Sequence, residues 1–160
     1  NKFKIVSNSK KILELGSSPG GWSQVICNFN KNASIQAFDI LDMQFKNSQI
    51  KFFKENFLEF DFNTLNEKYD LVLSDLAPNT VGHQSTDHLR IISLIEETIY
   101  IVENNIKSNG NFVFKLWKGS QDNIILSKLK NKFKKISNFK PQSSRSRSSE
   151  IYIVAERFIV

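Results

Sequence analysis

The sequence predicts an α/β domain in which helices cover a mostly parallel sheet. Short apolar runs alternate with longer amphipathic stretches, and this order is typical of such a sheet. The first apolar run also leads through a glycine-rich turn directly into a helical stretch. The 160 residues are 40% hydrophobic and 24% charged, which suffices for the core of one compact domain over residues 1–160.

In the first half of the chain, short apolar runs predict three strands, at Lys11–Leu15, Ser34–Phe38 and Ile50–Phe53. A helix is expected at Gly21–Asn30, directly after the glycine-rich turn. This order of strand, turn, helix and strand is the beginning of a parallel sheet.

The second half begins with a buried strand at Asp70–Ser74, followed by a long helix at Asp87–Lys107 that Gly110 is expected to end. The apolar stripe of this helix is Leu89, Ile92, Ile95, Ile99 and Val102. The remaining elements are predicted as a strand at Asn111–Leu116, a helix at Ser120–Phe133, and a closing pair of strands near Ile136–Phe139 and Ile151–Ala155. The sheet therefore has seven strands.

Basic residues are concentrated in one part of the chain. Residues 107–149 contain eleven Lys or Arg and one acid, Asp122, so this stretch carries +10, while the other residues sum to −4 and the whole chain to +6. Such a stretch favours a polyanionic partner such as nucleic acid. The alternative is a compositional bias, because 18 of the 22 basic residues are Lys in a chain with many Asn and Ile.

Two absences in the sequence narrow the class of protein. No run approaches the roughly 18 consecutive apolar residues of a membrane span, and the first residues lack the charged-then-apolar pattern of a secretion signal. Cys27 is the one cysteine, so neither an internal disulfide nor a cysteine-based zinc site is expected. We therefore expect a cytoplasmic protein, or a mitochondrial one if it comes from a eukaryotic organelle, that binds no membrane and no metal.

The glycine-rich turn after the first strand reads Gly16-Ser17-Ser18-Pro19-Gly20-Gly21-Trp22. Glycines permit a tight turn and let a ligand approach the backbone, and the helix N-terminus offers unpaired N–H groups. A dinucleotide fingerprint needs glycine where this chain has Ser18, followed by a stiff Pro19, so a pyrophosphate fits poorly. S-adenosylmethionine has no pyrophosphate. Its expected binding residues in the turn are Gly16, Ser18, Pro19, Gly20, Gly21 and Trp22, although Trp22 could instead pack the helix onto the sheet.

An acidic residue closes the second strand. Asp39 follows Gly16 by 23 positions, where a carboxylate can accept hydrogen bonds from both ribose hydroxyls of a cofactor. Glu14, at the end of the first strand, adds negative charge near the expected position of a sulfonium or ammonium group. The alternative for Asp39 is a cap on the following turn.

Polar residues also stand at the ends of three later strands. Asp75 and Asn79 follow a buried strand, at the carboxyl edge of the sheet where ligands of open α/β sheets bind. Lys115 ends an apolar strand, where it either extends to solvent or is held in a site, and Glu150 opens the last strand. Considered singly, each is more simply a surface charge or a turn cap.

Four blocks of the sequence together resemble the FtsJ/RrmJ-like family of ribose 2′-O-methyltransferases. The blocks are Leu-Gly-Ser-Ser-Pro-Gly-Gly-Trp-Ser-Gln (15–24), Ser-Asp-Leu-Ala-Pro-Asn (74–79), Phe-Lys-Leu-Trp (114–117) and Lys-Pro-Gln-Ser-Ser-Arg-Ser-Arg-Ser-Ser-Glu-Ile-Tyr-Ile-Val (140–154). They occur in family order and span nearly the whole chain. The resemblance implies a single Rossmann-like methyltransferase domain, with a mostly parallel seven-stranded sheet, helices on both faces and one antiparallel strand.

The resemblance also implies an S-adenosylmethionine-dependent enzyme with a Lys-Asp-Lys-Glu tetrad, of which Asp75, Lys115 and Glu150 match the last three members. A ribose hydroxyl is a poor nucleophile until its proton is removed. We therefore expect Lys115 to orient and deprotonate the 2′-hydroxyl, Asp75 to position Lys115 and the methyl donor, and Glu150 to hold the substrate ribose or its lysine partner. Asn79, Arg145 and Arg147 are the expected RNA contacts, ahead of a basic face at residues 128–135.

Three features depart from the family pattern. Glu14 stands where Asp is usual, and Asn56 stands where the family often has an acid that contacts the adenine amino group. Asn56 is still expected to accept that hydrogen bond through its side-chain oxygen. The first tetrad Lys has no match in the chain, so we expect it in a segment upstream of Asn1.

The predicted function is methyl transfer from S-adenosylmethionine to a ribose 2′-hydroxyl of RNA, with a uridine of large-subunit ribosomal RNA, free or in the assembled subunit, as the expected substrate. The enzyme is expected to be a monomer that needs no metal. Two alternatives remain at this stage. The first is an RNA-binding relative with impaired catalysis, and the second is a nicotinamide-dependent dehydrogenase.

Overall fold

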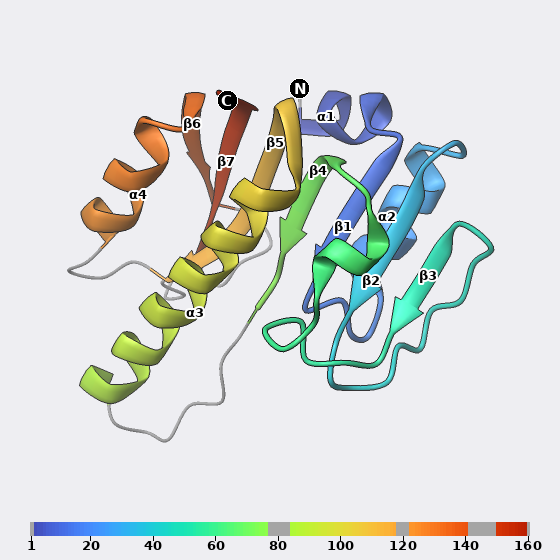
Figure 1. The fold of residues 1–160 in the computed structure, drawn as a ribbon, viewed down its shortest axis with the longest axis horizontal. Coiled ribbons are helices and arrows are strands. Elements are labelled where there is room, and N and C mark those ends of the chain that lie inside the picture. Colours follow the sequence, from blue (N-terminus) through green and yellow to red (C-terminus); the bar gives the residue numbers. More distant parts are fainter. Residues whose placement is uncertain (1, 77–83, 118–121, 141–149, 160) are drawn as a thin grey trace.

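A seven-stranded sheet runs through the computed structural model, which describes residues 2–76, 84–117, 122–140 and 150–159. The strand order is β3-β2-β1-β4-β5-β7-β6 (Figure 1). The strands are β1 (Lys11–Leu15), β2 (Ser34–Phe38), β3 (Ile50–Phe53), β4 (Tyr69–Ser74), β5 (Ile106–Trp117), β6 (Phe133–Phe139) and β7 (Glu150–Phe158). The prediction of seven strands in this part of the chain is therefore confirmed.

One strand of the sheet is antiparallel to the rest. Strands β1 to β5 pair in parallel, whereas β7 pairs antiparallel with both β5 and β6. In the β5–β7 pair, Lys115 lies opposite Tyr152 and Trp117 lies opposite Glu150. Directly opposite residues share a face of the sheet. This register therefore brings the Phe-Lys-Leu-Trp block (114–117) next to the Glu-Ile-Tyr part of the last block (150–152).

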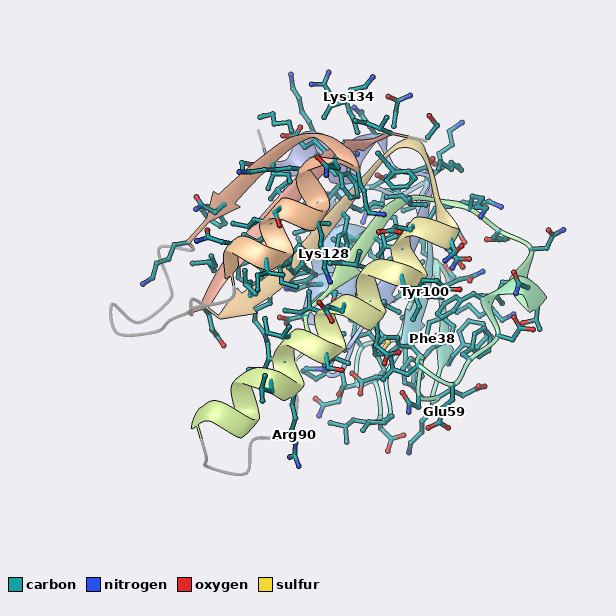
Figure 2. The ribbon with its side chains drawn as sticks, turned by 60° about the vertical axis from the view of Figure 1, so that its left-hand side comes forward. Phe38, Glu59, Arg90, Tyr100, Lys128 and Lys134 are labelled. Carbon is teal, nitrogen blue, oxygen red and sulfur yellow. The ribbon has the colours of Figure 1, made fainter. Side chains whose placement is uncertain are left out.

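Helices cover both faces, as predicted. Helices α1 (Lys2–Asn8) and α2 (Gly21–Phe29) lie on one face, where α2 contributes Ile26 and Cys27 to the buried cluster. The other face carries α3 (Gln84–Asn105), α4 (Asp122–Lys130) and the short 3₁₀ helix η1 (Phe62–Leu65). On that face Phe38, labelled in Figure 2, stacks on Phe53 with ring centroids 4.5 Å apart. No helix in the described part of the chain is long and apolar enough to cross a membrane.

Several predicted boundaries were wrong. Helix α3 ends at Asn105, whose side chain donates a hydrogen bond back to the Ile101 carbonyl, so Gly110 lies inside β5 instead of ending the helix. The β4–β5 register shifts between Tyr69 and Leu71, which accommodates this early start of β5. Strands β6 and β7 are also longer than predicted, and α4 ends at Lys130 instead of Phe133. Strand pairing therefore replaced the predicted helical residues at the C-terminal ends of both helices.

Two details of the helices were also missed. Helix α1 was not predicted, although its Ile5 and Val6 pack against the core beside α2. In α3 the predicted stripe holds for Ile92, Ile95, Ile99 and Val102, which are buried, but not for Leu89, which is 60% exposed. Leu89 lies near the start of α3, and among the side chains of this helix that the structure describes, Ile91 is the first in the core.

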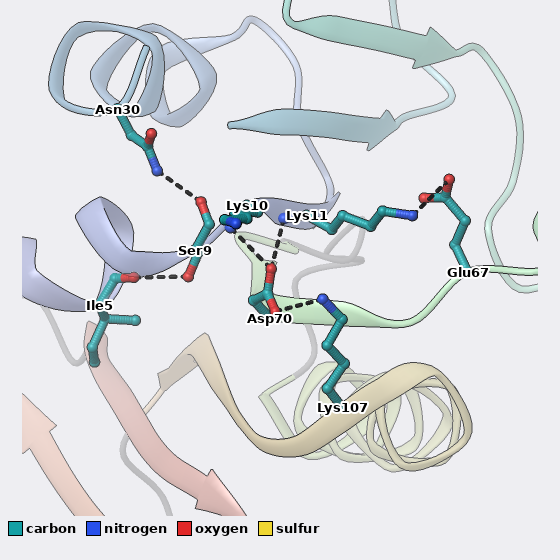
Figure 3. Close-up of polar contacts among 8 residues, drawn as sticks. All are labelled: Ile5, Ser9, Lys10, Lys11, Asn30, Glu67, Asp70 and Lys107. Carbon is teal, nitrogen blue, oxygen red and sulfur yellow. Dashed lines mark hydrogen bonds and ion pairs between the residues drawn. The ribbon is translucent and has the colours of Figure 1, made fainter. Parts of the chain in front are cut away.

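At the amino edge of the sheet, one carboxylate joins three segments. Asp70 accepts hydrogen bonds from the backbone N–H groups of Lys10 and Lys11 at 2.9 and 2.8 Å, and its other oxygen pairs with Lys107 Nζ at 2.6 Å (Figure 3). Burial would raise the pKa of Asp70, but the hydrogen bonds from Lys107 and from the two N–H groups outweigh it and hold the pKa below its ordinary value. This edge is therefore stabilised by a fully partnered charge.

Candidate functional site

The glycine-rich turn joins the carboxyl end of β1 to α2, and two of its glycines have positive φ angles. Gly16 has φ 74° and Gly20 has φ 112°. A Cβ on Gly20 would lie 2.6 Å from Phe45 Cβ, and one on Gly16 would lie 2.9 Å from Leu76 Cδ2. Both positions therefore require glycine for conformation and for close approach. A Cβ on Gly21, at the start of α2, would meet nothing within 4 Å, so space is open beside the helix N-terminus.

Asp39 links this turn to the end of β2. Its Oδ2 accepts a hydrogen bond from Ser18 N at 2.8 Å, and its Oδ1 accepts one from Leu41 N at 2.9 Å. The turn cap considered in the sequence therefore exists, and the same carboxylate also anchors the glycine-rich turn. Each carboxylate oxygen can accept a further hydrogen bond, so these contacts leave capacity for ribose hydroxyls.

Beneath the turn lies a buried acid. Glu14 is 1% exposed, and it accepts a hydrogen bond from the hydroxyl of Ser23, which is 0% exposed and belongs to the first turn of α2. Burial raises the pKa of Glu14 to about 7, against the lowering effect of the Ser23 hydrogen bonds, and the charges of Asp75 and Asp39 raise it further. The acids at the ends of β1, β2 and β4 are thus electrostatically coupled.

The three predicted tetrad residues lie together at the carboxyl edge. Lys115 Nζ is 2.9 Å from Asp75 Oδ1, and the lysine side chain is only 11% exposed. Burial raises the pKa of Asp75, the contacts with Lys115 lower it, and Glu150 raises it, with a net shift above the ordinary value. One ammonium group is therefore held between strands by a carboxylate, with a second carboxylate nearby.

Trp22 lies on the face of the sheet that α2 covers. Its ring packs against Tyr152 with centroids 5.5 Å apart, and both rings line an apolar groove of about 580 Å³. Tyr152 is the cross-strand neighbour of Lys115, and burial together with Asp75 and Glu150 raises its pKa to about 12. The packing alternative for Trp22 therefore matches its position, and Tyr152 is a further polar side chain beside the tetrad.

Asn56 forms a local turn after β3. Its Oδ1 accepts a hydrogen bond from Leu58 N at 3.2 Å, and its Nδ2 donates to Glu59 Oε1 at 2.8 Å. The oxygen expected to accept from an adenine amino group is therefore already engaged, with one lone pair remaining.

The predicted RNA contacts Asn79, Arg145 and Arg147 lie outside the described residues. The rival basic face at residues 128–135 is described, and three of its lysines have acidic partners. Lys128, labelled in Figure 2, pairs with Glu96, Lys132 pairs with Glu103 at 2.7 Å, and Lys135 pairs with Glu156 at 2.8 Å. These pairs weaken the positive field of that face.

The turn and its surroundings fit a nucleoside cofactor. Gly20, the N-cap of α2, makes no side-chain cap hydrogen bond, and within the first turn the Ser23 N–H donates to Glu14, which leaves the N–H groups of Gly21 and Trp22 without a side-chain cap. The hydroxyl oxygen of Ser17 is buried and has no hydrogen-bond partner among the described residues. A ligand group is a natural partner for such an atom. In the same part of the chain, no cluster of three or more His, Cys, Asp or Glu side chains is arranged to hold a metal ion.

Three polar residues of this site were not identified from the sequence: Ser17, Ser23 and Tyr152. Tyr152 could have been found by aligning the predicted antiparallel strands so that it faces Lys115. The pairing of Glu14 with Ser23 depends on how α2 sits on β1, and the sequence has no local pattern for that packing.

A sequence profile of FtsJ-like methyltransferases matches residues 1–158. The ribosomal RNA large subunit methyltransferase E of Rickettsia felis is 40% identical over 164 residues, which cover 96% of this chain and 72% of that protein. A crystal structure of a Plasmodium falciparum ribosomal RNA methyltransferase matches with TM-score 0.84 and 28% identity over 99% of this chain and 91% of that one.

Human methyltransferase-like protein 13, solved with S-adenosylhomocysteine, has TM-score 0.70 at 14% identity over 96% of this chain and 74% of that one, a likeness of fold alone. All of these similarities are to methyltransferases. They decide against the nicotinamide-dependent alternative.

Proposed function

Because the chain belongs to the FtsJ-like methyltransferase family, we propose that it transfers a methyl group from S-adenosylmethionine to a ribose 2′-hydroxyl of large-subunit ribosomal RNA. The observation that carries this proposal is the contact of Lys115 with Asp75, 2.9 Å long, at the same sheet edge as the glycine-rich turn. This arrangement supports a proposed proton acceptor and a proposed cofactor site at one edge of the sheet. The name of the Rickettsia relative supports the choice of RNA.

The cofactor site is proposed to consist of the turn and the acid of β2. When bound, S-adenosylmethionine supplies an electrophilic methyl carbon on a positively charged sulfur. Asp39 accepts hydrogen bonds from the ribose hydroxyls, while the N–H groups at the start of α2 receive the carboxylate. Gly16, Ser18, Pro19, Gly20 and Gly21 shape the backbone around it, and Asn56 serves the adenine amino group.

The proposed chemistry begins at the 2′-hydroxyl of the RNA. Lys115 must first lose a proton from its ammonium group to solvent. As the neutral amine it orients this hydroxyl and takes its proton as the oxygen forms its bond to the methyl carbon and the carbon–sulfur bond breaks. Asp75 holds Nζ in place through their contact, and Glu150 holds the substrate ribose or a lysine partner. Since the methyl carbon is already electrophilic, the proposed reaction needs no metal ion.

The RNA partner is proposed to contact Asn79, Arg145 and Arg147. The ion pairs of Lys128, Lys132 and Lys135 support this choice over the 128–135 face, because a paired lysine gains less from a phosphate. We further propose that the enzyme works as a cytoplasmic monomer on free or subunit-bound RNA.

The direct test is a methyl-transfer assay with the protein expressed from its complete reading frame. Large-subunit RNA and intact large subunits are incubated with S-adenosylmethionine, and 2′-O-methyl positions are mapped. We expect methylation of a single ribose, at a uridine. Cofactor and RNA binding without any methyl transfer would instead identify the catalytically impaired RNA-binding relative.

A further inference from the structure

Glu14 occupies an unusual electrostatic position in the site. It lies at the end of β1, fully enclosed, and in the described part of the chain its hydrogen bonds come from the hydroxyl and the backbone N–H of Ser23. Among the described residues, no lysine or arginine forms an ion pair with Glu14. A carboxyl in such surroundings has little to stabilise its charged form.

The titratable groups around Glu14 are also unfavourable to a negative charge. Asp39 after β2 and Asp75 after β4 both act on Glu14, and on α2 the Cys27 thiol, whose pKa is raised by burial, lies within its field. Burial first, and then the charges of Asp75 and Asp39, raise the pKa of Glu14 to about 7 against the lowering effect of the Ser23 hydrogen bonds. Near neutral pH the free protein therefore holds Glu14 as a mixture of acid and carboxylate.

We propose that Glu14 is a positioning residue for the cofactor, which fixes the first turn of α2 through Ser23 and gives up its proton to solvent when the cationic cofactor binds. This inference rests on the proposed cofactor site. A sulfonium charge close to three acids favours the ionised form of Glu14, and by linkage the ionised form favours the bound cofactor. The hydrogen bond from Ser23 holds the Glu14 carboxylate below the glycine-rich turn. The residue that fixes the first turn of α2 is therefore also the residue whose protonation changes when the cofactor binds.

The consequence is a pH-dependent affinity. Between pH 6 and 8, binding of S-adenosylmethionine should tighten about tenfold for each unit by which the bound cofactor lowers the pKa of Glu14. S-adenosylhomocysteine has the same groups without the sulfonium charge, so its affinity should depend less on pH. In the ligand-free protein the contribution of Glu14 to stability should follow the opposite trend, because its raised folded-state pKa makes that contribution fall as pH rises from 4.5 to about 7.

The experiment is calorimetric titration with S-adenosylmethionine at pH 7 in two buffers of different ionisation enthalpy, which measures protons released on binding. Wild-type protein should release protons, and Glu14→Gln should not. Glu14→Gln should still bind S-adenosylmethionine at pH 7, with the weaker affinity that wild-type protein has at low pH, where Glu14 is protonated. The matched control is Glu103→Gln, a carboxyl-to-amide change on α3 beside Lys132, which should leave proton release unchanged.

A second variant keeps the test valid if Glu14→Gln does not fold. Ser23→Ala removes a hydrogen bond that lowers the pKa of Glu14, so the pH of maximal proton release should move upward. Binding without proton release in wild type, release that persists in Glu14→Gln, or equal release with S-adenosylhomocysteine would each overturn the inference. Absence of binding at every pH would instead refute the proposed cofactor site.

Discussion

Strand β4 has an aspartate at each end, and the two carboxyls have opposite surroundings. Asp70, at the amino edge, has hydrogen bonds from Lys107 and two backbone N–H groups, and its pKa lies below the ordinary value despite burial. Asp75, just past the carboxyl end, has Lys115 as its one cationic partner among the described residues. Burial and the nearby Glu150 raise its pKa.

The difference indicates which end of the sheet serves stability and which serves chemistry. A carboxylate that is fully partnered contributes to the free energy of unfolding, as Asp70 does. A carboxyl whose charged form is disfavoured costs stability, and such groups cluster at functional sites. The lysines follow the same division, because Lys107 serves the amino edge and Lys115 the carboxyl edge.

The largest effect is expected for the lysine at the carboxyl edge. Lys115→Ala should lower single-turnover methyl transfer by roughly 10²–10⁴-fold, the usual contribution of a general base, with cofactor affinity close to wild type. Lys107→Ala is the matched control and should retain the wild-type rate. A Lys115→Ala rate within a few-fold of wild type would show that Lys115 is not the base.

The next effect concerns cofactor binding at the same edge. Asp39→Ala should weaken S-adenosylmethionine binding at least about tenfold, because two ribose hydroxyls lose a charged acceptor. The turn also loses its anchor at Ser18 N, so thermal unfolding is followed in parallel. A dissociation constant unchanged from wild type would remove Asp39 from the cofactor site.

At the amino edge, the expected effect is on stability alone. Asp70→Asn should lower the free energy of unfolding at pH 7 by about 1 kcal/mol, because a charged acceptor of three hydrogen bonds is neutralised. Since the folded-state pKa is lowered, this contribution exists above the ordinary value of 3.8 and is lost as pH falls through the folded-state pKa. Denaturant unfolding of wild type and Asp70→Asn at pH 7 and at pH 3 measures the loss of stability and its pH dependence. An equal difference in unfolding free energy between the two proteins at both pH values would contradict the prediction.

The smallest expected effect is on the salt dependence of RNA binding. Arg145→Ala together with Arg147→Ala should reduce the slope of log K against log salt by roughly 0.7–0.9 for each lost phosphate contact. Cofactor affinity should stay the same. If the slope does not change, the 128–135 face becomes the next candidate, and Lys130→Ala would test it.

Local patterns were sufficient to predict much of the carboxyl edge. The turn at Gly16 and the acid Asp39 were identified because strand, glycine turn and helix follow one another within a few residues, whereas Asp75 and Lys115 were placed at strand ends by pattern and assigned to the site by the family resemblance. What the sequence could not provide was contact between distant segments. The Asp70 cluster joins residues about 60 and 37 positions apart, and no periodicity encodes it.

The errors in the fold have the same origin. Strand β5 starts at Ile106, inside the predicted helix, because pairing with Tyr69 of β4 extends the sheet there. Glu14 and Ser23 were separated in the prediction into a strand and a helix, and only the packing of α2 on β1 makes them partners. Tertiary contacts thus determined where β5 begins and which side chain partners Glu14, and the local sequence of a single helix or strand determines neither.

The two ends of β4 provide the most direct measurement. Asp75→Asn and Asp70→Asn make the same chemical change five positions apart, and both are assayed for single-turnover methyl transfer and for unfolding free energy at pH 7. We predict that Asp75→Asn loses about 10²-fold in rate, since Lys115 is no longer held, with stability equal to or above wild type. Asp70→Asn should keep its rate and lose stability. A wild-type rate in Asp75→Asn, or an equal loss of stability in both variants, would contradict the division of the sheet into a structural and a catalytic edge.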